Sequence, residues 1–393
     1  MESNKPKLVF IASRFPYPLE KGDKLRSFHL IKELAKSYRI YLISLSDETV
    51  QSSWIQELEP FTEQQHVFQL NRAGIALRLI TAIFQSKPFQ VAYFTSFFVK
   101  RKINQCLKEI EPDHIFCQML RPAEYVKNYH WCPKTIDFMD SLSIGMQRRA
   151  TKASILSRWI FRIESERLRE YEQRIFNYFE HHVMISKQDA QLIAHPDHQK
   201  ISIIPNGIDA GYFSPQPSTE KGFDLVFVGN LSYAPNVDAI QWLYEKILKH
   251  NTEISLLVAG ANPGTYLKSL ANKNKQITLA GWQNDIRDAY SKGRIFIAPM
   301  QIGTGMQNKL LEAMSMAMPC ITTPLASIAI EAIPNEEILV GSNDQEILSH
   351  IRFLLQDPKS AKKIGEKARE CVLKNYHWEE SGMRLAELFT PQH

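Results

Sequence analysis

Short apolar runs recur along the chain, separated by longer stretches in which apolar residues follow helical spacing. The apolar runs, which predict buried strands, lie at residues 7–12, 39–45, 114–117, 135–138, 182–185, 223–228, 254–259, 276–279 and 294–298. Helical patterns cover residues 27–37, 141–179 and 237–248. Strands that alternate with helices predict an α/β protein with parallel sheets covered on both faces, and such sheets bind ligands beyond the carboxyl ends of their strands.

The chain is long enough for two hydrophobic cores, since it has 393 residues. Proline and glycine crowd residues 194–222, as in a connection between domains. We therefore expect an N-terminal domain at 1–200 and a C-terminal domain at 201–375.

Charge and cysteine content narrow the class of protein. Residues 1–200 hold 29 Lys and Arg against 22 Asp and Glu, so the first half is the basic one. The five cysteines lack C-x-x-C spacing, which argues against a disulfide framework or a zinc ribbon. The N-terminal apolar run is too short for a signal peptide, and no apolar stretch approaches the ~18 residues that span a bilayer. We expect a cytoplasmic protein, with peripheral contact at the inner face of the membrane left open, and no nucleic-acid partner.

Residues 299–319, PMQIGTGMQNKLLEAMSMAMP, are the most informative stretch. A strand ends before them, Gly303 and Gly305 form a loop, and a helical pattern follows. The unpaired N–H groups and the dipole of such a helix start attract an anion, and Lys309 adds a full positive charge. Glu312 is three residues further on, where its carboxylate can accept sugar hydroxyls. A diphosphate and a ribose would use these groups, although a packing turn followed by a surface Lys–Glu pair has the same local sequence.

This stretch resembles the donor-binding motif of family four glycosyltransferases of the GT-B fold, E-G-F-G-x-x-x-x-E-A-M-A-x-G-x-P. The matching positions are Gly305, Glu312, Ala313, Met314 and Pro319. Thr304 stands where the family has its first glutamate. The form G-x-Q-N-K-x-L-E-A-M looks like a bacterial sub-group associated with exopolysaccharide and exosortase gene systems.

The resemblance implies two Rossmann-like domains facing across a cleft, with residues 376–393 forming a helix that crosses back to the first domain. It implies a catalytic role for Lys309 and Glu312, and places the nucleobase at Gly281 and Trp282, where the indole can stack on it. The family's Arg and Lys for the diphosphate are absent from the stretch GNLSYAPN. Lys309 then becomes the leading phosphate ligand. The remaining donor-binding residues would be Gly229, Asn230, Gly303, Thr304, Gly305, Met306, Gln307 and Asn308.

The first domain supplies candidates for the acceptor side. The loop with Gly22, Asp23 and Lys24 should lie at the cleft, unless it is a plain Pro-rich connector. Gln118 and Arg121 follow a strand where many relatives have a histidine. Asp140, just past another strand end, is a third catalytic candidate, which could orient acceptor hydroxyls or cap the next helix.

Two segments of the first half are candidates for membrane contact. Residues 141–179 carry Arg148, Arg149, Lys152, Arg158 and Arg162, as a basic amphipathic helix on an anionic membrane would. Acidic residues from Glu164 onward dilute that charge, and a solvated helix packed on its own domain is the alternative. Residues 74–100 are rich in aromatic side chains, for which a place in the core is the default reading.

The expected activity is transfer of a sugar from a nucleotide-diphosphate sugar to a glycan or lipid-linked acceptor. The family retains the anomeric configuration, and no Asp-x-Asp occurs in the chain, so we expect no metal and no cofactor besides the co-substrate. A sugar-nucleotide epimerase or phosphorylase of the same fold, or a non-catalytic nucleotide-sugar binder, remains as an alternative.

Overall fold

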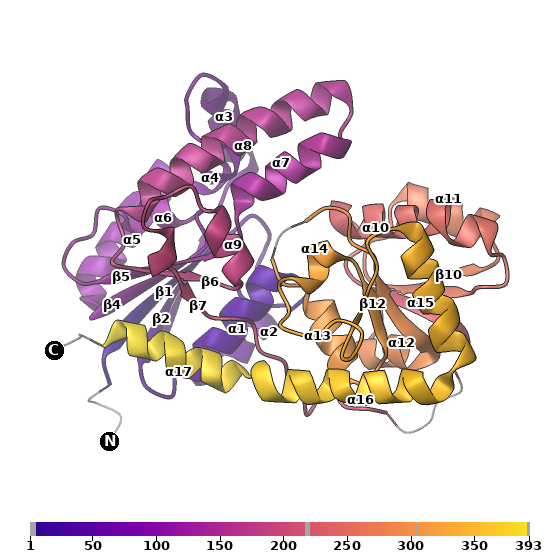
Figure 1. Cartoon of the computed structure of the whole chain (residues 1–393). Coiled ribbons are helices and arrows are strands. Elements are labelled where there is room, and N and C mark those ends of the chain that lie inside the picture. Colours follow the sequence, from indigo (N-terminus) through magenta and orange to yellow (C-terminus); the bar gives the residue numbers. More distant parts are fainter. Residues whose placement is uncertain (1–4, 217–220, 304, 391–393) are drawn as a thin grey trace. The chain divides into compact units, whose positions relative to one another are not determined.

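A computed structural model describes residues 5–216, 221–303 and 305–390. Thr304, one of the predicted donor residues, lies outside them. The chain forms two compact units, Met1–Asn206 with Trp378–His393, and Gly207–His377 (Figure 1). The sequence analysis had placed the boundary between the domains after residue 200, where the units divide after Asn206. It had placed the C-terminal helix that crosses back to the first domain at 376–393, where the first unit resumes at Trp378.

The first unit is built on a seven-stranded parallel sheet with the order β3-β2-β1-β4-β5-β6-β7. Its strands are β1 (Lys7–Ala12), β2 (Arg39–Ser46), β3 (Gln64–Gln69), β4 (His114–Gln118), β5 (Lys134–Met139), β6 (His181–Met184) and β7 (Ser202–Ile203). The order runs outward from β1 in both directions, so right-handed crossovers place helices on both faces.

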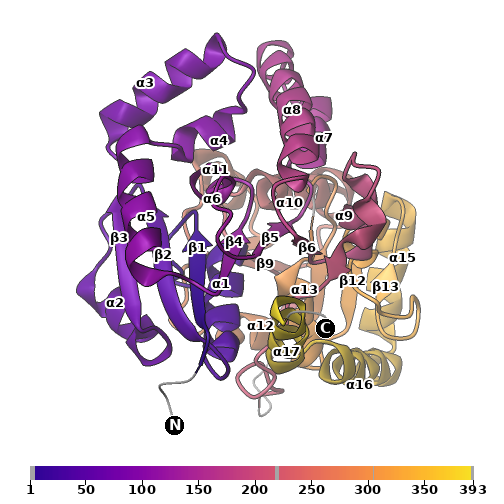
Figure 2. The same cartoon turned by 90° about the vertical axis from the view of Figure 1, so that its left-hand side faces the viewer.

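The helices of this unit differ widely in length. They are α1 (Gly22–Leu34), α2 (Ser52–Leu58), α3 (Arg72–Ile83), α4 (Phe89–Phe94), α5 (Phe97–Ile110), α6 (Ala123–Val126), α7 (Leu142–Lys152), α8 (Ile155–Phe176), α9 (Lys187–Leu192) and α17 (Trp378–Phe389). Short 3₁₀ turns lie at Glu59–Phe61 and His198–Lys200. Figure 2 shows α3 and the α7–α8 pair at the same end of the unit, beyond the sheet.

The core of the first unit surrounds β1, whose residues after Lys7 are fully buried. Helix α17 is the last element of the chain, yet Trp378, Leu385 and Phe389 pack in this core with residues of β1 and α1. The Oγ of Ser381 also donates to the carbonyl of Pro205 at 2.8 Å, just after β7.

The second unit repeats the design with a six-stranded parallel sheet, ordered β10-β9-β8-β11-β12-β13. Its strands are β8 (Phe223–Val228), β9 (Leu256–Ala259), β10 (Ile277–Gly281), β11 (Gly293–Ala298), β12 (Cys320–Thr322) and β13 (Leu339–Val340). Its helices are α10 (Ala234–Lys246), α11 (Thr265–Lys273), α12 (Ile286–Lys292), α13 (Asn308–Ser315), α14 (Pro324–Ser327), α15 (Asp344–Gln356) and α16 (Pro358–Asn375), with a 3₁₀ turn at Leu248–His250. The predicted α/β class with two parallel-sheet domains is therefore confirmed.

The predicted start of the first helix was wrong. Helix α1 begins at Gly22, so Gly22, Asp23 and Lys24 form its first turn and are not part of the preceding loop. An acidic residue in a first turn is favoured by the helix dipole, which explains why Asp23 fits there. The helical material predicted at 141–179 is present as two helices, because the chain breaks at Ala153 and Ser154 and turns back as α8.

Candidate functional site

The candidate donor site lies at the point where the strand order of the second sheet reverses. The sheet runs outward from β8 on one side and from β11 on the other, so the loops after these two strands flank the gap between them. Ligands of doubly wound sheets bind at such a point. The loop after β8 begins at Gly229, and the loop after β11 leads into α13, which carries Lys309 in its first turn.

The side chain of Lys309 reaches from α13 to the end of β8. Its ammonium donates to the Oδ1 of Asn236, an α10 residue, and lies 4.6 Å from the ring centroid of Phe227. A Cβ added to Gly229 would lie 3.5 Å from the Nζ of Lys309 and 2.6 Å from the Nδ2 of Asn236. Because glycine has no side chain, the side chains of Asn236 and Lys309 can lie against the backbone at this position. The ammonium of Lys309 therefore lies beside Gly229 and Asn236, between the loops that follow β8 and β11.

Burial lowers the pKa of Lys309 to about 7, against the opposing effect of the charge on Glu312. A bound anion would favour the protonated form and raise this pKa again.

Glu312 lies on α13 one turn after Lys309. Its Oε2 accepts a 2.6 Å hydrogen bond from the hydroxyl of Tyr290, at the end of α12. Burial raises the pKa of Glu312, while the Tyr290 hydroxyl and the charge of Lys309 act in the opposite direction. Tyr290 is fully buried and fixes the carboxylate, so Glu312 is held in one orientation for accepting hydroxyl groups.

The other predicted donor residues lie on the same edge of the sheet. Trp282 follows β10 and is 60% exposed, so one face of its indole is open to a ligand. Gly305 has a φ of +74°, which glycine adopts without strain. Asn230 uses its Oδ1 to hold the turn, accepting from the backbone N–H of Ser232 at 2.9 Å. Gly281 ends β10, Gly303 lies in the loop after β11, and Met306, Gln307 and Asn308 lead into and begin α13.

The predicted acceptor residues meet at the corresponding point of the first sheet, between β1 and β4. The carboxylate of Asp23 accepts a 2.6 Å ion-pair hydrogen bond from Arg14, and Arg121 lies 4.0 Å from the same oxygen. Burial alone raises the pKa of Asp23, but the charges of Arg14 and Arg121 outweigh it and lower the pKa overall. The ring of Phe94 lies under both guanidinium groups, at 5.9 Å from Arg14 and 5.5 Å from Arg121.

Gln118 and Lys24 are occupied by neighbours within this unit. The amide of Gln118 donates to the carbonyl of Asp23 at 2.7 Å and accepts from the hydroxyl of Ser27, so it fastens β4 to α1. Lys24 donates to Glu48 at 3.1 Å, and its ammonium lies 5.5 Å from the ring centroid of Trp54. Gly22 is exposed at the start of α1.

Asp140 follows β5 in a bend, and the helix after it is capped by the Oγ of Ser141 instead. The adjacent Met139 has a φ of +64°, an unusual value for a residue with a side chain. The buried carboxylate of Glu172 accepts from the N–H and Oγ of Ser143 at 3.0 Å and 2.6 Å. Burial raises the pKa of Glu172 to about 7, and the charge of Asp140 adds to this effect.

Sequence reasoning missed Asn236 and Tyr290, which hold Lys309 and Glu312. It also missed Arg26. The Nε of Arg26 donates to Asp137 at 2.6 Å, and both side chains are fully buried. The Nη1 of Arg26 donates to Asn206 at 2.9 Å. No local pattern marks these residues, because each acts on a partner far away in the chain.

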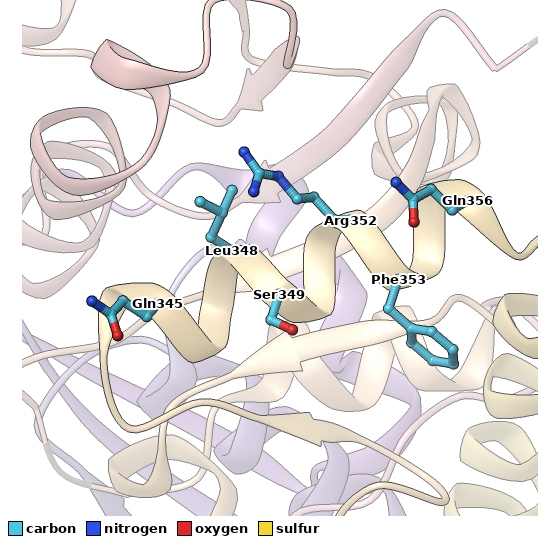
Figure 3. Close-up of a pocket in the computed structure, with 6 residues that line it drawn as sticks. All are labelled: Gln345, Leu348, Ser349, Arg352, Phe353 and Gln356. Carbon is cyan, nitrogen blue, oxygen red and sulfur yellow. The ribbon is translucent and has the colours of Figure 1, made fainter.

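A hollow elsewhere on the second unit contains none of the predicted site residues. Its six lining residues all come from α15 (Figure 3). They are Gln345, Leu348, Ser349, Arg352, Phe353 and Gln356. Arg352 is already engaged with the Oδ1 of Asn251 at 2.9 Å, so this hollow is a surface feature of one helix.

Two features are absent from the described residues. Nowhere in residues 5–216, 221–303 and 305–390 do three or more His, Cys, Asp or Glu side chains come together as metal ligands. Across the same part of the chain, every helix is too short or too polar to cross a bilayer.

Comparison with known proteins relates the second unit to a family. Residues 222–357 match the family described as glycosyl transferases group 1. The whole chain is similar to an uncharacterized 44.6 kDa protein in the cps region of Klebsiella pneumoniae, at 23% identity over 94% of this chain and 96% of that protein. An Escherichia coli UDP-Gal:alpha-D-GlcNAc-diphosphoundecaprenol alpha-1,3-galactosyltransferase is 28% identical over 32% of this chain and 37% of its own length.

Solved structures extend the likeness in fold to the whole chain. Sucrose-phosphate synthase from Thermosynechococcus elongatus aligns with a TM-score of 0.73 at 14% identity, covering 98% of both chains. Anabaena Alr3699/HepE in complex with UDP and glucose aligns with a TM-score of 0.71 at 12% identity, covering 98% of this chain and 100% of the other. The chain therefore has the two-domain GT-B fold, and its residues 222–357 match the family of glycosyl transferases group 1.

Proposed function

We propose that this protein transfers a sugar from a nucleotide-diphosphate sugar to a glycan or lipid-linked acceptor, with retention of anomeric configuration and without a metal ion. The observation that carries the proposal is the position of Lys309, whose ammonium is directed at Gly229 between the loops that follow β8 and β11. The match of this unit to glycosyl transferases group 1 supports the same reading.

Residues of the second unit can bind each part of the nucleotide sugar. Lys309 and the N-terminal end of α13 would neutralise the diphosphate, including the negative charge that develops on it as it leaves. Each hydrogen-bond donor aimed at that charge contributes a few kcal/mol. Glu312, fixed by Tyr290, would accept the ribose hydroxyls, and Trp282 would stack on the base. Relatives named for undecaprenol-linked and lipopolysaccharide acceptors support a glycan or lipid-linked acceptor for this chain.

The acceptor would bind to the first unit. Positive and negative groups lie together at the ends of β1 and β4, where they would bind the hydroxyls of a sugar acceptor. They are the guanidinium groups of Arg14 and Arg121 and the carboxylate of Asp23. Asp140, beside β5, would orient the attacking hydroxyl. In a same-face reaction the acceptor hydroxyl bonds to the anomeric carbon as the phosphate oxygen departs, and that oxygen takes the hydroxyl proton.

A thermal-shift screen with UDP, GDP, CMP and their sugars tests the donor assignment, because a ligand that binds only the folded state raises the melting temperature. Donor turnover is then measured with an extracted lipid-linked acceptor, without acceptor, and with inorganic phosphate, each with and without EDTA. Transfer only with the acceptor, unaffected by EDTA and giving an α-linked product from an α-linked donor, is expected. Product without acceptor would indicate an epimerase, product with phosphate a phosphorylase, and binding without turnover a non-catalytic binder.

The Tyr290→Phe variant tests the role of Glu312. Removing the hydroxyl leaves the carboxylate in place but frees its orientation, so the KM for the donor should rise several-fold with a smaller change in kcat. Glu312→Gln should weaken nucleotide-sugar binding more than the binding of inorganic pyrophosphate, which lacks the ribose. Equal losses for both ligands would contradict a ribose-binding role.

A further inference from the structure

Large apolar side chains are exposed at one end of the first unit. They belong to α3, to the residue after it, and to the first turns of α8, and Figures 1 and 2 both show α3 and α8 at this end, beyond the sheet. Phe84 is 85% exposed and Trp159 67% exposed. We call this the α3–α8 surface and define it by Leu77, Ile80, Ile83, Phe84, Trp159 and Ile160.

Hydrogen bonds join the C-terminal end of α3 to the middle of α8, about two turns after Trp159 and Ile160. Arg167 of α8 donates to the carbonyls of Ala82 and Ile83, at 2.7 Å and 3.1 Å, and so closes the C-terminal end of α3. Glu164, one turn earlier on α8, accepts from the N–H groups of Phe89 and Gln90 at 2.7 Å and 2.9 Å, at the start of α4. The segment that carries Phe84 is thus fixed at both ends.

The two sequence segments that carry these residues have basic side chains and no acidic ones. Between Glu63 and Glu109 the chain has seven Lys and Arg residues and no Asp or Glu, and between Asp140 and Glu164 it has five and none. All six residues of the α3–α8 surface lie within these two segments. The first acidic residue of α8, Glu164, is buried against the α4 backbone, and acidic side chains become exposed on α8 only from Glu166 onward.

We propose that the α3–α8 surface binds the face of an anionic phospholipid bilayer. Exposed Leu, Ile, Phe and Trp side chains enter the interfacial layer, where Trp is favoured, and Lys and Arg pair with anionic headgroups. A patch of this kind on a soluble protein usually marks an interaction site. A second copy of the chain is a poor occupant, because it would bring two sets of exposed cations, Arg158 and Arg162 of each copy, together.

Membrane binding through this surface does not depend on the donor site, which lies entirely in the second unit. It would hold the first unit, with its candidate acceptor residues, next to an acceptor dissolved in the bilayer. The two proposals can therefore fail separately, because UDP binding and vesicle binding are measured on the same variants.

Vesicle flotation of the full chain provides the test, with phosphatidylcholine alone or mixed with phosphatidylglycerol. We expect binding to the mixed vesicles only, weakened by salt because the attraction is electrostatic. Trp159→Ser should lower the partition coefficient by about tenfold through lost apolar burial. Arg158→Gln combined with Arg162→Gln should lower it by roughly 25-fold, at about fivefold for each cation. UDP binding should be unchanged in all variants.

Trp131→Ser is the matched control, since Trp131 is 88% exposed in the same unit but lies outside both acid-free segments. It should bind mixed vesicles like the natural chain. The proposal is overturned if the natural chain does not float with mixed vesicles, or if Trp131→Ser loses as much binding as Trp159→Ser. It is also overturned if the chain self-associates in the absence of lipid and Trp159→Ser makes it monomeric, which would assign the surface to a second copy.

Discussion

Replacing Lys309 with methionine should make the second unit more stable and at the same time abolish donor binding. Methionine has a similar length and carries no charge, so it can occupy the space beside Phe227 and Met300 without the cost of burying an ammonium group. A lysine retained only for stability would show the opposite behaviour, because its removal would weaken the fold.

The size of the effect follows from the pKa. A fall from 10.5 in the unfolded chain to about 7 in the folded one corresponds to at most about 5 kcal/mol of destabilisation, at about 1.4 kcal/mol for each pH unit. This cost is complete below the folded pKa, shrinks as the pH rises from 7 toward 10.5, and disappears above 10.5. The variant leaves the Oδ1 of Asn236 without its donor, at a cost of roughly 1 kcal/mol, so a gain of about 3 kcal/mol remains at pH 7.

Urea denaturation at pH 7 and pH 10 measures this difference, with Lys249→Met as the control. Lys249 is an exposed lysine of the same unit, paired with Glu245 at 3.4 Å, and its replacement should change the free energy of unfolding by less than about 0.5 kcal/mol. Lys309→Met should unfold at a higher urea concentration than the natural chain at pH 7, and the gap should nearly close at pH 10. UDP binding, measured by calorimetry at pH 7, should be lost.

The reasoning fails if Lys309→Met is destabilised by the same amount at both pH values. It also fails if the variant still binds UDP with the natural affinity, since the phosphate would then be held by other groups.

Three further outcomes are expected. UDP affinity of the natural chain should fall by up to about tenfold for each pH unit above 7, because binding requires the protonated form of Lys309; an affinity that does not change between pH 7 and pH 9 would contradict this. Gly229→Ala should abolish UDP binding, because its Cβ would lie 2.6 Å from the Nδ2 of Asn236, whereas Gly222→Ala meets nothing within 4 Å and should bind normally in the same calorimetry. Arg26→Met should destabilise the first unit by about 3–5 kcal/mol by leaving Asp137 buried without its partner, and Asp137→Asn in the same chain should recover part of the loss in urea denaturation.

The sequence predicted the central strands well because burial on both faces produces continuous apolar runs. Strands β1 and β8 lie at the residues expected, 7–12 and 223–228. Strand β3 was missed because its sequence, QQHVFQ, is mainly polar and its residues are only partly buried at the edge of the sheet. An edge strand of this kind carries little of the apolar pattern from which strands are predicted.

For the candidate site, Lys309 and Glu312 were selected from a single stretch of sequence, and their roles stay predictions. The structure places them on α13, in the segment that follows β11, where two neighbouring strand ends diverge. Asn236 and Tyr290 could not be found in this way, because only the folding of α10 and α12 against α13 brings them into contact. The aromatic residues of 74–100 had been expected in the core. That expectation was wrong for Phe84, Phe97 and Phe98, since composition does not determine which face of a helix is covered.

The place of α17 has a consequence for how the chain is made on the ribosome. Trp378, Leu385 and Phe389 complete a core whose other members, in β1 and α1, leave the exit tunnel hundreds of residues earlier. The half of the protein that is translated first is therefore the half that finishes folding last, and until α17 has left the ribosome a nascent first unit has an uncovered apolar surface along α1. Chains interrupted before residue 378 would keep that surface exposed, and they are the ones that chaperones and proteases would be expected to recognise.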